Sequence, residues 1–276
     1  MKLKNKIIVL TGAAGGFGAH LVPLFLKQGA SVWALDMNLD GLKRLKFEIE
    51  KSGFEIEIRQ ADVSKHEALE KIAAELKKKD ILPDVWINNA GISHPESFEN
   101  TLPETFQKIL DVNLNGVLNG SRVALKLMNE KQSGIIVNVA SVAGHLPCPF
   151  LSPYVTSKYA VVGFTKSLQL ELYQQASPIK ALLVSPGFAD TPIMKTNKDF
   201  AFPKFLNWMV SRPEAVAKDI VNAIIAEKED TYPGLSGRAF LLFQKMAPKA
   251  LFRFSTRMLT ARNFKELVGL EGIRSR

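Results

Sequence analysis

The sequence predicts an α/β fold in which a doubly wound parallel sheet lies between two layers of helices. Along the chain, short apolar runs alternate with longer amphipathic stretches, which is the element order of strand–helix–strand units. The runs Ile7–Leu10 and Ile135–Val137 are apolar at every position, as strands covered on both faces require. This alternation predicts right-handed crossovers and a parallel sheet.

The elements are expected in the following order. Short apolar runs bounded by turn residues predict strands at Ile7–Thr11, Ser31–Asp36, Glu55–Asp62, Val85–Asn88, Gly134–Ala140 and Lys180–Ser185. The longer amphipathic stretches predict helices at Gly16–Gln28, Asp40–Lys51, Lys65–Lys79, Glu104–Asn129, Tyr154–Gln175 and Pro213–Glu227. The last helix carries its own start signal, a capping box with Ser211 as N-cap and Glu214 as the third helical residue.

Composition excludes several classes of protein. With 46% hydrophobic and 23% charged residues, the 276-residue chain is neither collagen-like nor intrinsically disordered. Its single cysteine, Cys148, can form neither an internal disulfide nor a Cys-based zinc site, and no His-Glu-x-x-His motif occurs, so no catalytic metal is expected. The run Ile7–Leu10 is too short for a signal peptide, and no window reaches the ~18 apolar residues of a spanning helix. A cytoplasmic location is therefore expected.

The net charge of +9 is concentrated near the C-terminal end. Residues 238–276 contain nine basic and two acidic side chains, so the rest of the chain is nearly neutral. A chain-wide electrostatic attraction to nucleic acid is therefore not expected, and any electrostatic partner should meet the C-terminal segment.

A glycine-rich turn, Thr11–Gly18, joins the first predicted strand to the first helix. Its glycines allow backbone N–H groups to approach a pyrophosphate at the positive end of the helix, although an ordinary βα turn can have the same composition. Asp36 ends the second strand, where a carboxylate can accept hydrogen bonds from both ribose hydroxyls. It also repels a 2′-phosphate, and neither Met37 nor Gly15 supplies a cation, so NAD is favoured over NADP.

Polar residues follow the later strands. Asp62 can accept from an adenine amino group, or it can cap the next helix. Asn88–Gly91 either lies beside a cofactor or forms a turn that satisfies buried backbone groups. Tyr154 and Lys158 share one helix face at their four-residue spacing, and a neighbouring ammonium lowers the pKa of a phenol, which is near 10. Ser141 ends the fifth strand, where its hydroxyl can bind a substrate oxygen.

Together these motifs resemble the compact branch of the short-chain dehydrogenase/reductase family, which has a Rossmann-like three-layer α/β/α fold. The resemblance extends from residue 5 to about residue 228, with the motifs in the family's order and spacing. The matching segments are Thr11–Gly18, Asp36, Asp62, Asn88–Gly91, Asn113 in Asp-Val-Asn, Ser141, Tyr154, Lys158, Pro186-Gly187 and Thr191.

The resemblance implies an NAD-dependent enzyme that transfers a hydride to or from a small-molecule secondary alcohol or ketone. In that scheme Tyr154 is the acid/base, and Lys158 lowers its pKa and holds the nicotinamide ribose. Ser141 polarises the substrate C–O group, and Asn113 holds a water molecule. The implied cofactor contacts are Gly12, Ala14, Gly16, Phe17, Gly18, Asp36, Met37, Asp62, Val63, Asn89, Ala90, Gly91, Tyr154, Lys158, Pro186, Gly187, Phe188 and Thr191.

The chain is expected to have two parts. Residues 1–235 would form the dinucleotide-binding and catalytic domain, with a substrate loop at about 187–210, and residues 236–276 a basic amphipathic helical extension. In the family, the helices that correspond to 104–129 and 154–175 usually form dimer faces, which implies a homodimer or homotetramer.

Two interpretations of the extension compete. Its helices either lie on the body or a partner subunit with solvated basic residues, or make peripheral contact with an anionic membrane or cover a hydrophobic pocket. The extension loosely resembles those of family members that act on lipid-like or steroid-like alcohols. Apolar side chains between Phe200 and Met209 add to this, so a hydrophobic substrate is included in the hypothesis.

Other functions stay open as alternatives. They are a non-catalytic dinucleotide-binding regulator, an NAD-dependent dehydratase or epimerase of related fold, and a membrane-surface protein built on the extension. A regulator has no physical need for the Tyr154–Lys158 pair, and the spacing Gly12-x-x-x-Gly16-x-Gly18 suits the shorter branch of the fold. His94 and His145 are expected to be exposed loop residues near the substrate, and Cys148 to line the pocket.

Overall fold

Seven strands form one sheet in the order β3-β2-β1-β4-β5-β6-β7, and every neighbouring pair is parallel. The computed structural model describes residues 1–190, 210–234, 237 and 239. The strands are β1 (Ile7–Thr11), β2 (Ser31–Asp36), β3 (Glu57–Gln60), β4 (Val85–Asn88), β5 (Gly134–Val139), β6 (Ile179–Val184) and β7 (Asp230–Thr231). The predicted doubly wound parallel sheet is therefore confirmed.

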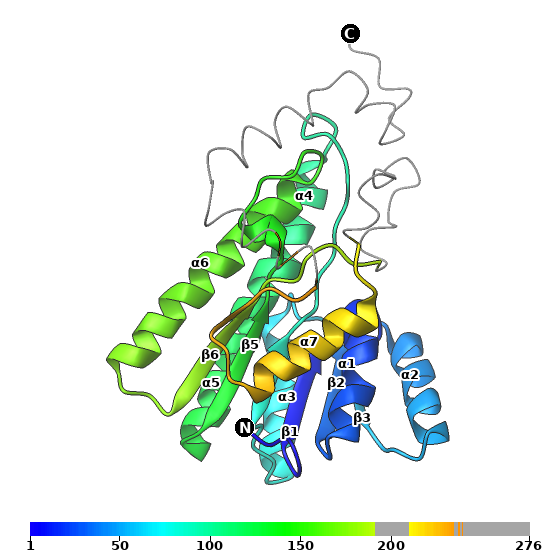
Figure 1. The fold of residues 1–276 in the computed structure, drawn as a ribbon, viewed down its shortest axis with the longest axis vertical. Coiled ribbons are helices and arrows are strands. Elements are labelled where there is room, and N and C mark those ends of the chain that lie inside the picture. The colour runs from blue at the N-terminus through cyan, green and yellow to red at the C-terminus, as the bar shows by residue number, and fades with distance from the viewer. Residues whose placement is uncertain (191–209, 235–236, 238, 240–276) are drawn as a thin grey trace.

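Helices cover both faces of the sheet (Figure 1). They are α1 (Gly16–Lys27), α2 (Leu39–Lys51), α3 (His66–Lys78), α4 (Pro103–Leu110), α5 (Gly116–Lys131), α6 (Ser152–Gln174) and α7 (Pro213–Ile225), with a π-helical turn η1 (Asp111–Asn115) and a 3₁₀ turn η2 (Val142–Gly144). One core cluster joins α1, α2 and α7 to the sheet, and a second joins α3, α5 and α6 to its other face. Strands such as β4 are consequently buried at every position, which explains their unbroken apolar sequences.

The predicted single helix at 104–129 is divided in the structure. It consists of α4, the π-helical turn η1 and α5. The turn contains Asn113, which is fully buried. Its side chain accepts from the backbone N–H of Ile92 at 2.8 Å and donates to the carbonyl of Ile92 at 2.9 Å. A π-helical turn often marks a functional position, and here it contains a side chain whose partners are distant in sequence.

The predicted capping box at Ser211 is wrong. The N-cap of α7 is Arg212, without a side-chain cap, and Pro213 occupies the first turn. Ser211 instead forms an isolated parallel bridge with Ala189, and its backbone N–H donates to the carbonyl of Phe188 at 2.9 Å. The strand β7 is not predicted by the sequence, because a pair of polar residues at a sheet edge lacks the apolar run on which strand prediction depends.

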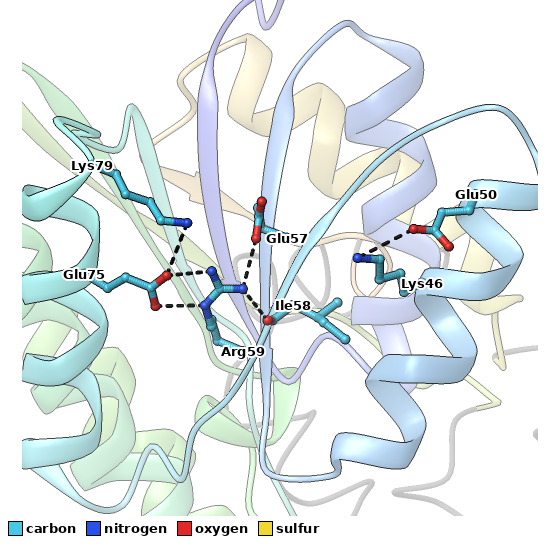
Figure 2. A network of polar contacts seen from close by, with 7 residues as sticks. All are labelled: Lys46, Glu50, Glu57, Ile58, Arg59, Glu75 and Lys79. Carbon is cyan, nitrogen blue, oxygen red and sulfur yellow. Dashed lines mark hydrogen bonds and ion pairs between the residues drawn. The ribbon is translucent and has the colours of Figure 1, made fainter.

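An ion-pair network connects the edge strand β3 to α3 (Figure 2). Arg59 of β3 binds both carboxylate oxygens of Glu75 in α3, at 2.8 and 2.5 Å, and Glu57 at 2.9 Å. The hydrogen bonds from Arg59 are the main cause that lowers the pKa of Glu75 to about 2. The Arg59 guanidinium also lies 4.8 Å from the ring centroid of Trp33 in β2, so one side chain holds three elements together.

Two predicted segments lie outside the described residues. They are most of the substrate loop, residues 191–209, and the extension 236–276 except Gly237 and Ala239. Thr191 belongs to the first of them. Within the described part of the chain, no helix has the length and hydropathy needed to cross a bilayer.

Candidate functional site

A cavity of about 270 Å³ opens at the carboxyl ends of the central strands. The strand order reverses between β1 and β4, and in doubly wound sheets ligands bind in the crevice outside that point. The residues that line the cavity are Gly12, Gly15, Gly16, Phe17, Asp36, Met37, Ala61, Asp62, Val63, Asn89, Ala90, Gly91, Ile92, Val112, Val139, Ala140, Tyr154 and Lys158.

The glycine-rich turn forms one wall of the cavity. Gly12 has a φ of +65° and lies so close to Ala90 that a Cβ would be 2.7 Å from the Ala90 Cα atom. At Gly18, a Cβ would be 2.1 Å from the carbonyl oxygen of Gly12. Around Gly15 and Gly16 there is open space instead. The turn is therefore tightly packed on the protein side and open where it starts helix α1.

Replacement of Gly18 by alanine is expected to lower the free energy of unfolding by about 1–3 kcal/mol, because its methyl group meets backbone atoms that cannot move aside. The matched control is Gly163→Ala, since Gly163 is a helical glycine in α6 with open space around its Cβ position. That change should stabilise the chain by about 0.5–1 kcal/mol. Chemical denaturation of both variants measures the difference. Equal stabilities would contradict the close approach at Gly18.

Thr11 and Asn89 fix the turn against β4. The Thr11 hydroxyl donates to the carbonyl of Ile87 at 3.2 Å and accepts from the backbone N–H groups of Asn89 and Ala90 at 3.0 and 3.1 Å. The Asn89 side chain donates to the carbonyls of Thr11 and Gly12. These bonds hold the first and fourth strand ends in register, so Asn89 supports the cavity wall with its amide group.

Asn88, by contrast, lies beneath the cavity. Its amide donates to Asn138 at 2.8 Å and to Ser121 at 3.1 Å, and it accepts from the Trp86 indole at 2.9 Å. Asn88 is buried and these three partners are side chains, so it satisfies buried polar side chains, whereas Asn89 bonds the backbone groups as predicted.

Asp36 and Asp62 stand at the ends of β2 and β3 on the cavity wall. The Asp36 carboxylate accepts from the backbone N–H groups of Ala14 and Asn38, both at 2.9 Å. Met37 beside it is 60% exposed. Asp62 accepts from the backbone and hydroxyl of Ser64, whereas the N-cap of α3 is Lys65. The alternative in which Asp62 caps that helix is therefore wrong.

Tyr154 and Lys158 meet at the beginning of α6. Lys158 is only 3% exposed; its ammonium donates to the carbonyl of Val139 at 2.9 Å and lies 5.7 Å from the Tyr154 ring centroid. Burial lowers the pKa of Lys158 to about 8. Burial likewise raises the pKa of Tyr154 to about 12, while its hydrogen bond with Ser141 acts in the opposite direction. In the cofactor-free chain at neutral pH, Tyr154 is therefore a neutral phenol. The Lys158 ammonium beside it has a pKa only slightly above neutral pH.

Asn113 supports this pair from behind. Its amide donates to the Ser157 hydroxyl at 3.0 Å, and that hydroxyl donates to the carbonyl of Tyr154 at 2.7 Å. Gly91 lies close to both Asn113 and Lys158, since a Cβ there would be 3.4 Å from Asn113 Oδ1 and 3.6 Å from Lys158 Nζ. A chain of contacts therefore connects the π-helical turn η1 with the start of α6.

The remaining predicted residues that the structure describes are not among those that line the cavity. The Ala14 N–H donates to the Asp36 carboxylate, and Gly18 packs on Gly12 and Ala13. Ser141 caps η2 by accepting from the N–H of Ala143 at 3.1 Å. The backbones of Pro186 and Gly187 are held by Val142 and Pro233, respectively. Phe188, which like Asn113 is absent from the wall, pairs with Ser211.

Sequence reasoning misses several apolar wall residues. They are Ala61, Ile92, Val112, Val139 and Ala140. Ala61, Val139 and Ala140 follow or end the strands β3 and β5, so the rule that ligands bind at carboxyl ends of strands is a signal that could have found them. Ile92 and Val112 carry no such signal.

The expectation for His145 is wrong. His94 is exposed as predicted, but His145 is half-buried, with Nε2 2.9 Å from the Ser185 hydroxyl and its ring 5.3 Å from that of Tyr232. Burial lowers the pKa of His145. Cys148 is half-buried but is absent from the cavity wall, and burial raises the pKa of its thiol to about 11. Among the described residues, no cluster of His, Cys, Asp and Glu could hold a metal ion.

Comparison with known proteins identifies similar chains. A family model described as short chain dehydrogenase matches residues 6–201. A 3alpha-hydroxysteroid dehydrogenase from Mediterraneibacter gnavus is 33% identical over 241 residues, covering 83% of this chain and 88% of that protein.

Two solved structures share the fold. A short chain dehydrogenase/reductase from Burkholderia phymatum in complex with NAD has a TM-score of 0.80 and 24% identity, covering 91% of this chain and 95% of its own. A short chain dehydrogenase from Burkholderia cenocepacia in complex with NADP has a TM-score of 0.76 and 24% identity, covering 94% and 100%.

Proposed function

Because the chain belongs to the short-chain dehydrogenase/reductase family, we propose that it is an NAD(H)-dependent oxidoreductase acting on a secondary alcohol or the corresponding ketone. The observation that carries this proposal is that Tyr154 and Lys158 line the same cavity as the glycine-rich turn and Asp36. The candidate acid/base pair and the residues expected to bind a dinucleotide thus line the same cavity.

The residues present fit a dinucleotide. Open space at Gly15 and Gly16 leaves the start of α1 accessible to a pyrophosphate, and the Asp36 carboxylate stands at the end of β2 where a ribose would lie. The wall between them is largely apolar, as a site for aromatic rings requires. When bound, the nicotinamide ring accepts or supplies the hydride.

The protein's own groups would handle the proton and the substrate. Tyr154 takes the alcohol proton during oxidation and returns it during reduction. Lys158 stabilises the phenolate electrostatically and binds the nicotinamide ribose, while Ser141 orients the substrate oxygen. Asn113 holds a water molecule that connects Lys158 to solvent. Pro186, Gly187, Phe188 and Thr191 would contact the nicotinamide carboxamide.

Substitution of Asp36 by asparagine should shift cofactor preference toward NADPH. Hydrogen bonds to a charged group contribute about 1.5–3 kcal/mol, so we expect the ratio of the NADPH to the NADH dissociation constant to fall about 10- to 100-fold. Fluorescence titration with both cofactors measures this ratio. The control is Asp40→Asn, an exposed acid in the first turn of α2 outside the cavity wall, which should leave the ratio unchanged. Preference for NADPH in the native chain would overturn the assignment.

The substrate is proposed to be hydrophobic, either lipid-like or steroid-like. The similarity to a 3alpha-hydroxysteroid dehydrogenase supports this class. Residues 1–235 would form the catalytic domain. Homodimers or homotetramers would form through α5 and α6, because α6 exposes Tyr159, Leu170 and Tyr173.

The direct test combines cofactor binding with turnover. NADH and NADPH are titrated into purified protein, and NAD⁺-dependent oxidation is then assayed with medium-chain and sterol-like secondary alcohols. Tight NADH binding with turnover supports the proposal. NADH binding without turnover of any alcohol or reduction of any matching ketone would favour a dinucleotide-binding regulator. Turnover that releases water or inverts a centre without net oxidation would favour the dehydratase or epimerase alternative.

A further inference from the structure

His145 links the turn after β5 to the ends of two further strands. It comes directly after the 3₁₀ turn η2, whose N-cap is Ser141. Its Nε2 lies 2.9 Å from the hydroxyl of Ser185, the residue after β6, and its ring centroid lies 5.3 Å from that of Tyr232, the residue after β7. Ser185 is only 1% exposed, so this contact reaches into the interior of the protein.

The turn η2 fixes the direction of the Ser141 side chain. The Ser141 hydroxyl accepts from the Ala143 N–H at 3.1 Å, and the Ser141 carbonyl accepts from the Gly144 N–H at 2.9 Å. Gly144 packs on α6, since a Cβ there would be 2.7 Å from the carbonyl oxygen of Lys158. The Ser141 hydroxyl also forms a hydrogen bond with Tyr154, which lowers the pKa of that phenol. A displacement of η2 would therefore move the Ser141 hydroxyl relative to Tyr154.

Both ends of η2 are attached to the segment after β6. At its first residue, the Val142 N–H donates to the carbonyl of Pro186 at 2.9 Å. Beyond its last residue, the contact between His145 and Ser185 makes a second attachment. Two attachments fix the orientation of the turn, whereas the first alone would allow it to rotate about Val142.

The contact between His145 and Ser185 carries no charge at pH 7. Burial is the main cause that lowers the pKa of His145, while the Asp230 carboxylate raises it and the Lys166 ammonium lowers it. Asp230 and Lys166 form an ion pair with each other, so their effects on the imidazole oppose one another. A neutral imidazole nitrogen and a hydroxyl can share one hydrogen without placing a charge in the interior.

We propose that His145 is a positioning residue, whose hydrogen bond to Ser185 holds η2 so that the Ser141 hydroxyl faces Tyr154. This inference rests on the function proposed above, in which Ser141 and Tyr154 act on the substrate oxygen. His145 is absent from the cavity wall, so it acts through Ser141 and not by contact with the cofactor. Its removal should therefore slow proton transfer more than it weakens NADH binding.

Kinetics of two single variants test this role. His145→Leu removes the imidazole, and Ser185→Ala removes its partner with the loss of only one hydroxyl. Each should lower kcat for alcohol oxidation about three- to tenfold, the range of one hydrogen bond, and leave the NADH dissociation constant within about twofold. His145→Gln keeps a side-chain amide able to reach Ser185 and should restore kcat to within about twofold of the native value.

The pH profile gives a readout that a merely structural role would not change. Oxidation needs the deprotonated phenol, so kcat rises with pH as Tyr154 loses its proton. A displaced Ser141 lowers the Tyr154 pKa less, and the midpoint of this rise should therefore move upward by about half a pH unit in His145→Leu and Ser185→Ala. The control Ser121→Ala removes an equally buried serine hydroxyl from α5 and should leave the midpoint unchanged.

Double variants show whether His145 acts through Ser141. Ser141→Ala/His145→Leu should have the same kcat as Ser141→Ala, because the hydroxyl that His145 positions is already absent. His145→Leu/Ser185→Ala should likewise match His145→Leu alone. A further loss of kcat in the first double variant would overturn the proposal, since His145 would then act independently of Ser141.

Hydrogen exchange in the cofactor-free chain gives a second readout that needs no turnover. The peptide with the Ala143 and Gly144 amides should exchange about tenfold faster in His145→Leu and Ser185→Ala than in the native chain or Ser121→Ala. Unchanged exchange in both variants would overturn the proposal. Faster exchange in a chain that oxidises no alcohol and reduces no ketone would support the attachment of η2 and overturn only the function proposed above.

Discussion

Tyr154→Phe is expected to lower kcat for alcohol oxidation by about 10²–10⁴-fold, the range contributed by a positioned general acid/base. The phenyl ring can occupy the same place at the start of α6, so NADH affinity should fall far less than kcat, by no more than the loss of one hydrogen bond, about tenfold. The ammonium of Lys158 keeps its contact with the Val139 carbonyl in this variant. Steady-state kinetics with the best alcohol of the panel, together with fluorescence titration of NADH, measure both quantities.

The control for this prediction is Tyr159→Phe. Tyr159 lies on the same helix but is 42% exposed and absent from the cavity wall, so its loss of a hydroxyl should leave kcat within about twofold. Ser141→Ala should give an intermediate loss, because the hydrogen bond from Ser141 is what lowers the Tyr154 pKa against burial. Retention of a tenth or more of kcat in Tyr154→Phe would assign the proton transfer to another group.

Local sequence predicts most of the sheet, because strands that are buried on both faces have unbroken runs of apolar residues. The bounds of β1, β2 and β4 agree with prediction residue for residue, since their apolar runs stop at polar or glycine residues. The π-helical turn η1 could not be predicted in the same way. It depends on the contacts of the Asn113 side chain with Ile92 and Ser157, which are remote in sequence.

The same distinction applies to the site. The glycine-rich turn, Asp36, Tyr154 and Lys158 are found from sequence because each occupies a fixed place relative to its own strand or helix. Contacts between residues far apart in the sequence cannot be predicted from these local patterns. Ser211 satisfies the local rule for a capping box, yet its backbone is held by Phe188. His145 has the local context of an exposed loop residue, yet it is half-buried and contacts Ser185 and Tyr232.

Replacement of Lys158 by methionine should inactivate the enzyme and make the cofactor-free chain more stable at pH 7. Burial lowers the pKa of Lys158 from 10.5 to about 8. At 1.36 kcal/mol per pKa unit, keeping this ammonium charged in the folded chain costs on the order of 3 kcal/mol. Loss of the hydrogen bond to the Val139 carbonyl offsets about 1 kcal/mol. We therefore expect a net stabilisation of about 1–3 kcal/mol, which identifies the charge as a functional requirement.

The stability difference between the native chain and Lys158→Met should depend on pH. Between pH 8 and 10.5 the unfolded chain binds more protons at Lys158 than the folded chain, so the native free energy of unfolding should rise with pH in that window relative to Lys158→Met. The free energies of unfolding of the two proteins should therefore converge as the pH rises. Chemical denaturation of both proteins at pH 7, 9 and 10.5 measures them. The control Lys166→Met removes a surface ion pair with Asp230 from the same helix and should cost less than about 1 kcal/mol at every pH. If Lys158→Met were less stable than the native chain at pH 7, the ammonium would be stabilising, and burial could not be what holds its pKa down.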